Sequence, residues 1–117
     1  MQKILMILNE SPYGNERTYN ALRYGILLSQ QKEINLKLFL VGDAVASAKK
    51  GQKVPSGYYN AEIMLVSVIK NNVETGICGT CIDARGIKAE ELVEGVHRSS
   101  MAELTAWTLD ADKIVTF

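Results

Sequence analysis

The sequence Lys3-Ile4-Leu5-Met6-Ile7-Leu8 places five consecutive apolar residues near the start of the chain. Strands with one solvent-exposed face alternate apolar and polar residues, whereas strands covered on both faces are continuous apolar runs. The stretch therefore predicts a central strand of a parallel sheet. It stops at Asn9-Glu10, too soon for the apolar region of a signal peptide, and no segment is long enough to suggest a membrane span.

Strand-like and helical segments alternate along the rest of the chain. Further strands are expected at residues 36–41, 73–77 and 113–117, with a brief strand or an extended link at 96–98. Helices are expected at about 15–30, 43–50, 60–71, 80–85, 88–94 and 100–109. Parallel neighbours need crossover connections, so this order predicts an α/β fold in a single domain, 1–117. We expect a five-stranded, mainly parallel sheet with helices on both faces.

Helix start signals suggest where several of these helices begin. Asn15 or Gly14 is expected to cap the first helix, and Asp43 the short second one. Ser100 and Glu103 have capping-box spacing, in which each side chain bonds the other residue's backbone N–H. The helix that follows is expected to bury one face, formed by Met101, Leu104 and Thr108.

The helix expected at 60–71 is apolar nearly all round. Its apolar side chains are Ile63, Met64, Leu65, Val66, Val68 and Ile69. A surface helix needs only one apolar face, so we expect this one to pack on the sheet and also against another subunit, in a homo-oligomer larger than a dimer. The alternative is that the preceding loop, 49–57, folds over its outer face. That loop contains glycine, proline and lysines, and it is expected to be mobile.

Composition narrows the function classes. Thirteen basic and thirteen acidic residues cancel and form no basic stripe, so we expect no direct nucleic-acid partner. The two cysteines lie three residues apart, and no export signal is recognised. A cytoplasmic, reducing location is therefore expected, where such a pair is catalytic or metal-binding more often than a structural disulfide.

Both cysteines lie in the stretch Gly76 to Gly86, which reads Gly-Ile-Cys-Gly-Thr-Cys-Ile-Asp-Ala-Arg-Gly. It follows the strand-like segment 73–77, and Gly79 is expected to let the backbone turn sharply after Cys78. A short helix would follow, with Gly86 in the left-handed position that ends it. Both sulfurs would then lie near a helix N-terminus, which favours the reactive thiolate.

The chain resembles the DsrE/DsrF-like family along its whole length. The residues that carry the resemblance are Cys78-Gly79-Thr80-Cys81-Ile82-Asp83-Ala84-Arg85-Gly86-Ile87, the opening Met1-Gln2-Lys3-Ile4, Ser11-Pro12-Tyr13-Gly14, and the ending Trp107-Thr108-Leu109. The resemblance implies a flavodoxin-like sheet assembled into trimers or hexamers. We expect no cofactor and no metal. Relatives of this kind carry sulfur as a persulfide on one cysteine, whose position matches Cys78, and exchange it with donor and acceptor proteins.

Each residue of the motif has a functional and a structural interpretation. Cys78 is the candidate nucleophile and sulfur carrier, or else a buried apolar residue. Cys81 would resolve a Cys78 persulfide by forming a disulfide, or it only packs under the turn. Asp83 would accept a proton and Arg85 would hold an anionic sulfur, unless the two pair with each other or across an interface. His97 is the only histidine and is not placed in the site.

Three rival functions remain open. A dithiol oxidoreductase is suggested by the Cys-x-x-Cys spacing, but neither Pro12 nor Pro55 is placed as the thioredoxin pattern implies. A zinc site needs more ligands than two thiols and a distant histidine, unless symmetry-related chains complete it. The third rival is a non-enzymatic assembly protein.

Overall fold

The computed structural model describes residues 1–117 and contains one five-stranded sheet in which every neighbouring pair is parallel. The strands are β1 (Gln2–Leu8), β2 (Ile34–Leu40), β3 (Glu74–Cys78), β4 (Val96–Ser99) and β5 (Lys113–Thr116), in the order β4-β3-β2-β1-β5. The expected α/β fold is confirmed, and the segment at 96–98 is a true strand. β1 lies between β2 and β5, with Leu5, Met6 and Leu8 fully buried, as its apolar run predicts.

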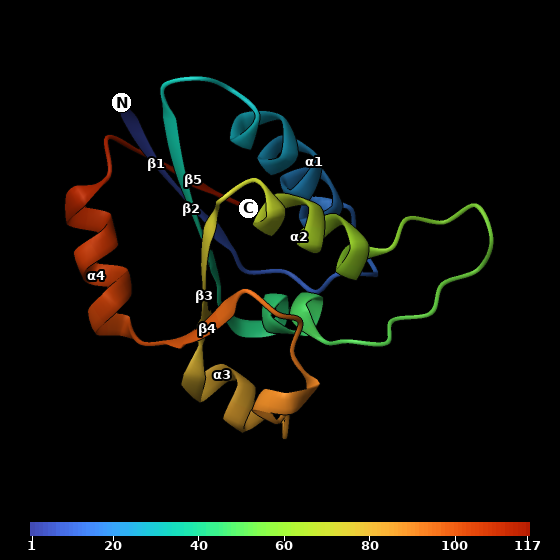
Figure 1. Ribbon diagram of the computed structural model, residues 1–117. Helices are drawn as coiled ribbons and strands as arrows, with labels where there is room; N and C mark the ends of the chain where they lie inside the picture. The colour runs from blue at the N-terminus through green and yellow to red at the C-terminus, as the bar shows by residue number, and fades with distance from the viewer.

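Helices cover the two faces unequally. They are α1 (Arg17–Ser29), α2 (Ala61–Lys70), α3 (Gly79–Ala84) and α4 (Met101–Asp110), with 3₁₀ turns η1 (Gly42–Ala48) and η2 (Ala89–Glu91). From β1 to β4, each successive strand is added on the same side of the one before it, so right-handed crossovers place α1 and α2 on one face of the sheet. The connection from β4 to β5 crosses the sheet in the opposite direction and therefore places α4 on the other face (Figure 1). No helix combines the length and apolar character required to cross a bilayer.

Helix ends follow the expected signals only in part. Asn60 caps α2, since its side chain accepts a hydrogen bond from the Ile63 N–H at 3.1 Å. The residue at the N-cap of α1 is Glu16, not Asn15 or Gly14, although the Asn15 side chain accepts a bond from the N–H of Arg17. Asp43 lies inside the first turn of η1 and does not cap it. The helix expected at 88–94 is reduced to the single turn η2.

The buried side of α4 differs from the predicted face. Trp107 is its one buried residue, whereas Met101 and Thr108 lie on the exposed side. Ser100 caps the helix by accepting from the Glu103 N–H at 3.2 Å, but the Glu103 carboxylate turns instead to β4, so the reciprocal capping-box bond is absent. The bulky indole, rather than the three-residue spacing of smaller side chains, decides which side packs on the sheet.

The loop at 49–57 is anchored near its start by the polar side chain of Gln52. Gln52 Nε2 donates to the carbonyls of Ser47 at 2.9 Å and Lys49 at 3.0 Å, and its Oε1 accepts from the Tyr13 hydroxyl at 2.6 Å. Beyond Gln52 the loop has no helix or strand and projects away from the sheet (Figure 1).

Gln52→Ala is expected to lower the free energy of unfolding by about 1–3 kcal/mol, because it leaves carbonyl and hydroxyl groups unpaired in a partly buried place. Urea unfolding measures this loss, and Lys53→Ala, an exposed neighbour, is the control. By hydrogen exchange, residues 53–58 should exchange faster than the strands in both wild type and variant. Exchange across 53–58 as slow as in the strands would contradict this description of the loop.

Candidate functional site

The two cysteines lie at the carboxyl edge of the sheet. Cys78 is the last residue of β3 and the N-cap of α3, and Cys81 lies in the first turn of that helix. η1 packs beside them because β2 and β3 are neighbours and each ends at this edge. Ligands and reactive groups collect at the carboxyl ends of parallel strands, so the motif is placed where such chemistry is expected.

Gly79 and Gly86, two of the three glycines in this stretch, have different structural roles. Gly86 has φ of +64° and closes α3, with its N–H bonded to the Asp83 carbonyl and the Ile87 N–H bonded to the Ile82 carbonyl, as predicted. The backbone passes directly from β3 into α3 at Gly79, so it turns after Cys78 as expected, and it does so without a left-handed backbone angle. A Cβ at Gly79 would lie 2.7 Å from the guanidinium of Arg98, so glycine leaves room for that side chain.

The sulfurs form a short chain of hydrogen-bonding groups. Cys81 Sγ donates to Cys78 Sγ at 2.6 Å, and Cys78 Sγ also lies 3.4 Å from the Thr80 hydroxyl. The backbone N–H of Gly42, at the start of η1, donates to Cys81 Sγ at 3.2 Å. Cys78 is 3% exposed, and Cys81 is half-buried. Both thiols are free, and they are close enough to form a disulfide with a small movement.

The surroundings favour ionisation of Cys78 over Cys81. Burial raises the pKa of the Cys78 thiol, but hydrogen bonds from the side chains and backbone N–H groups of Cys81 and Thr80 outweigh it and bring the pKa below its ordinary value. Burial raises the pKa of Cys81, and its bond to the Cys78 sulfur raises it further. The pair therefore has an inner nucleophile, Cys78, and a second thiol that donates to it.

A cavity of about 390 Å³ adjoins the inner thiol. It is lined by Cys78, Gly79, Thr80, Arg98, Ser99, Ser100 and Met101. These residues come from the end of β3, the end of β4 and the starts of α3 and α4, so strand order assembles the cavity. A small reactant can approach Cys78 from this side, whereas Cys81 does not line it.

Asp83 and Arg85 do not pair with each other. Asp83 forms a two-point ion pair with Arg98, at 2.9 and 2.7 Å, which holds the pKa of the Asp83 carboxyl below its ordinary value. Arg85 binds Asp43 at 2.8 Å and donates to the backbone carbonyl of Cys81 at 3.1 Å. The guanidinium beside the Cys78 cavity is thus that of Arg98, which the sequence did not single out.

His97 lies outside the cysteine site, as expected. Its Nε2 faces the Glu103 carboxylate at 2.5 Å, and its ring packs edge-on against Trp107. Glu74, His97 and Glu103 form a group able to hold a metal ion, and that group includes neither cysteine. The thiol pair of one chain therefore has no third ligand for the zinc site weighed above.

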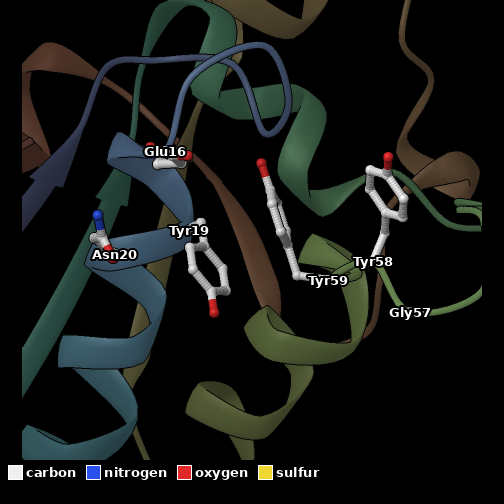
Figure 2. Close-up of a pocket in the computed structure, with 6 residues that line it drawn as sticks. All are labelled: Glu16, Tyr19, Asn20, Gly57, Tyr58 and Tyr59. Carbon is white, nitrogen blue, oxygen red and sulfur yellow. The ribbon is translucent and has the colours of Figure 1, made fainter.

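The tyrosines form a second hollow on the α1 and α2 side. Tyr59 stacks between Tyr13 and Tyr19, with ring centres 5.5 and 4.3 Å away. Figure 2 shows Tyr58 on the other side of Tyr59 from Tyr19. Tyr19, Tyr58 and Tyr59 line a cleft of about 410 Å³ together with Glu16, Asn20 and Gly57. Through this stacking, Tyr59 holds the end of the loop against Tyr19 of α1 and against Tyr13.

Comparison with known proteins gives a consistent family assignment. The model of the DsrE/DsrF-like family matches residues 2–117. Protein YchN of Escherichia coli strain K12 is 44% identical over 118 residues, covering 100% of both chains. An uncharacterized protein of Methanocaldococcus jannaschii is 39% identical and covers 98% of this chain and 99% of its own.

Solved structures agree with the fold. The crystal structure of the YchN protein from E. coli superposes with a TM-score of 0.93 and covers 100% of both chains. A protein of unknown function from Methanobacterium thermoautotrophicum has a TM-score of 0.78 at 11% identity, also over 100% of both chains. At that identity the likeness is one of fold alone.

Proposed function

Because the chain belongs to the DsrE/DsrF-like family, we propose that it is a sulfur-relay protein that carries a persulfide on Cys78. The observation that carries the proposal is the inner thiol itself. Cys78 has a pKa below its ordinary value, accepts hydrogen bonds from Thr80 and Cys81, and adjoins a cavity that admits a small reactant. A family relationship without such a thiol would support the fold only.

Sulfur uptake needs no cofactor. The Cys78 thiolate attacks the outer sulfur of a donor persulfide, the donor's S–S bond breaks, and the donor leaves as a thiolate while a new S–S bond forms on Cys78. Delivery reverses the roles, since an acceptor thiolate attacks the outer sulfur and Cys78 leaves. Neither step changes the total number of S–S bonds. The positive guanidinium of Arg98, which lines the cavity, would stabilise an anionic outer sulfur.

Cys81 supplies a second route. Its thiolate can attack Cys78 Sγ, expel the outer sulfur as hydrosulfide and leave a Cys78–Cys81 disulfide, which an external dithiol must reduce before the next cycle. The Gly42 N–H donates to Cys81 Sγ and Arg85 lies nearby, and both favour the Cys81 thiolate. Cys81 would thus set how long the persulfide survives.

A dithiol oxidoreductase is the second candidate, favoured by the 2.6 Å separation of the sulfurs. In that function Cys78 and Cys81 would cycle between dithiol and disulfide by exchange with a partner protein and would carry no extra sulfur. The two functions use the same nucleophile, so they differ in the product and not in the site.

Incubation with a persulfide generated by a cysteine desulfurase tests the proposal. Intact-mass and peptide mass spectrometry of the wild-type chain should find one added sulfur, located on Cys78. Formation of only a Cys78–Cys81 disulfide that cycles with a reductant would establish the dithiol oxidoreductase instead. If neither thiol reacts faster than a model thiol, the protein is better described as an assembly or binding module.

We also propose that the chain forms a homo-oligomer, a trimer or a hexamer. Apolar side chains remain exposed on three elements: Ile63 on α2 is 64% exposed, Leu109 on α4 83% and Ile114 on β5 46%. β5 is also an edge strand with one side unpaired. A second copy would cover surface that a monomer leaves in water.

Light scattering of the purified chain at micromolar concentration should give a mass of at least three subunits. Ile63→Glu is expected to shift the distribution toward smaller species, because it places a charge in an apolar contact. Lys53→Glu is the control, since it adds a carboxylate on the exposed loop. A stable monomer at micromolar concentration would disprove the oligomer.

A further inference from the structure

A cluster of metal-ligating side chains lies on the α4 face of the sheet, apart from the cysteine site. The ligand atoms of Glu74, His97 and Glu103 all lie within 4.8 Å of one another. From these positions we propose a binding site for a divalent transition metal ion of the zinc class, with three protein ligands and an open position for water.

Three elements bring these side chains together. In the sheet register His97 pairs with Gly76, two residues along β3 from Glu74, so Glu74 and His97 point to the same face. Glu103 reaches the same place from the first turn of α4, whose position is held by Trp107 packed against the sheet. No sequence-local motif connects the three: the pairing of β3 with β4 brings Glu74 beside His97, and the crossover from β4 through α4 adds Glu103.

The contacts within the cluster favour ligand binding. His97 Nε2 and Glu103 Oε1 share a hydrogen bond of 2.5 Å, and a metal ion would take the place of the shared proton. The Ser99 hydroxyl donates to the same carboxylate, which orients it as outer-shell partners orient metal ligands.

The donor set selects among metals. One imidazole and two carboxylates suit Zn²⁺ and its first-row neighbours, whereas Ca²⁺ needs more oxygen ligands and Mg²⁺ rarely takes imidazole. One positive group opposes the ion: Lys37 Nζ lies 3.8 Å from Glu74 and 5.0 Å from the centre of the Trp107 ring. Lys37 acts as the counter-ion of the empty cluster and weakens the site when metal binds.

The experiment uses the untagged chain carrying Cys78→Ser and Cys81→Ser, so that no thiol can bind the probe. Co²⁺ is titrated by visible absorption and Zn²⁺ by calorimetry. We expect one ion per chain. His97→Gln and Glu74→Gln should each weaken binding by more than about 100-fold, since removal of a ligand should cost at least as much as removal of its outer-shell support.

Lys37→Met should strengthen binding about tenfold, because it removes a positive charge next to the ion. Asp110→Asn, which removes a carboxylate from α4 outside the cluster, should leave the affinity unchanged. Circular dichroism checks that each variant folds. Absence of saturable binding in the thiol-free chain, or unchanged affinity in both His97→Gln and Glu74→Gln, would overturn the proposal.

Discussion

Cys78→Ser is expected to reduce sulfur uptake from a donor persulfide to background, whereas Cys81→Ser should still take up one sulfur and hold it longer than wild type. The asymmetry follows from the geometry, since Cys78 lines the cavity and has the lowered pKa, whereas Cys81 does not line the cavity and has a raised pKa. A serine hydroxyl at position 78 is not ionised at neutral pH and cannot carry the persulfide. Time-resolved intact-mass measurements give the amount and the lifetime of the added sulfur.

The two serine variants are matched controls for each other. Each replaces one sulfur by oxygen with little change in volume, and serine at position 81 can still donate a hydrogen bond to Cys78. A difference between them therefore reports which sulfur reacts. Uptake by Cys78→Ser at the wild-type level, with the sulfur on Cys81, would reverse the roles proposed here.

The parallel sheet could be predicted from the sequence because a strand buried on both faces is a continuous run of apolar residues. The apolar run of β1 and the regular alternation with helices require no knowledge of distant contacts. The helix α2 was predicted equally well, since the residues after Asn60 are strongly apolar. Strands and helices that are determined by neighbouring residues were therefore predicted correctly.

Short helices and the buried faces of helices were predicted less accurately than the strands. η2 keeps only one 3₁₀ turn of the helix expected at 88–94, and Asp43 binds Arg85 in place of a cap. On α4 the face was assigned by spacing, but Trp107 has an edge-on partner in Phe39 across the sheet. In each case a tertiary contact outweighs a weak local preference.

The candidate site likewise contains residues that a sequence motif brings together and residues that only the fold brings together. Cys78 and Cys81 share one turn, so a sequence motif brings them together. Gly42 and Arg98 come from the ends of other strands, and their place beside the thiols depends on β3 lying between β2 and β4. The sequence signal that could have placed Arg98 in the site was the short strand at 96–98, because a parallel neighbour of β3 ends beside Cys78.

The largest stability loss is expected from Phe39→Ala. Phe39 is fully buried in β2 and meets the Trp107 ring edge-on at 6.1 Å, so it joins the sheet to the one helix on that face. Its register partner on β3 is Gly76, which has no side chain to fill the space left by the ring. The free energy of unfolding should fall by about 3–5 kcal/mol, and the melting temperature by roughly 10–20 °C.

Phe39→Leu separates the cavity from the loss of the aromatic contact. Leucine keeps most of the buried volume and should cost less than about 1.5 kcal/mol. Urea unfolding of both variants, monitored by the fluorescence of Trp107, measures the two losses and reports on α4 directly, because Trp107 is the only tryptophan. If Phe39→Ala costs no more than Phe39→Leu, then α4 moves inward to close the cavity, and the packing of this helix on the sheet is looser than the buried indole indicates.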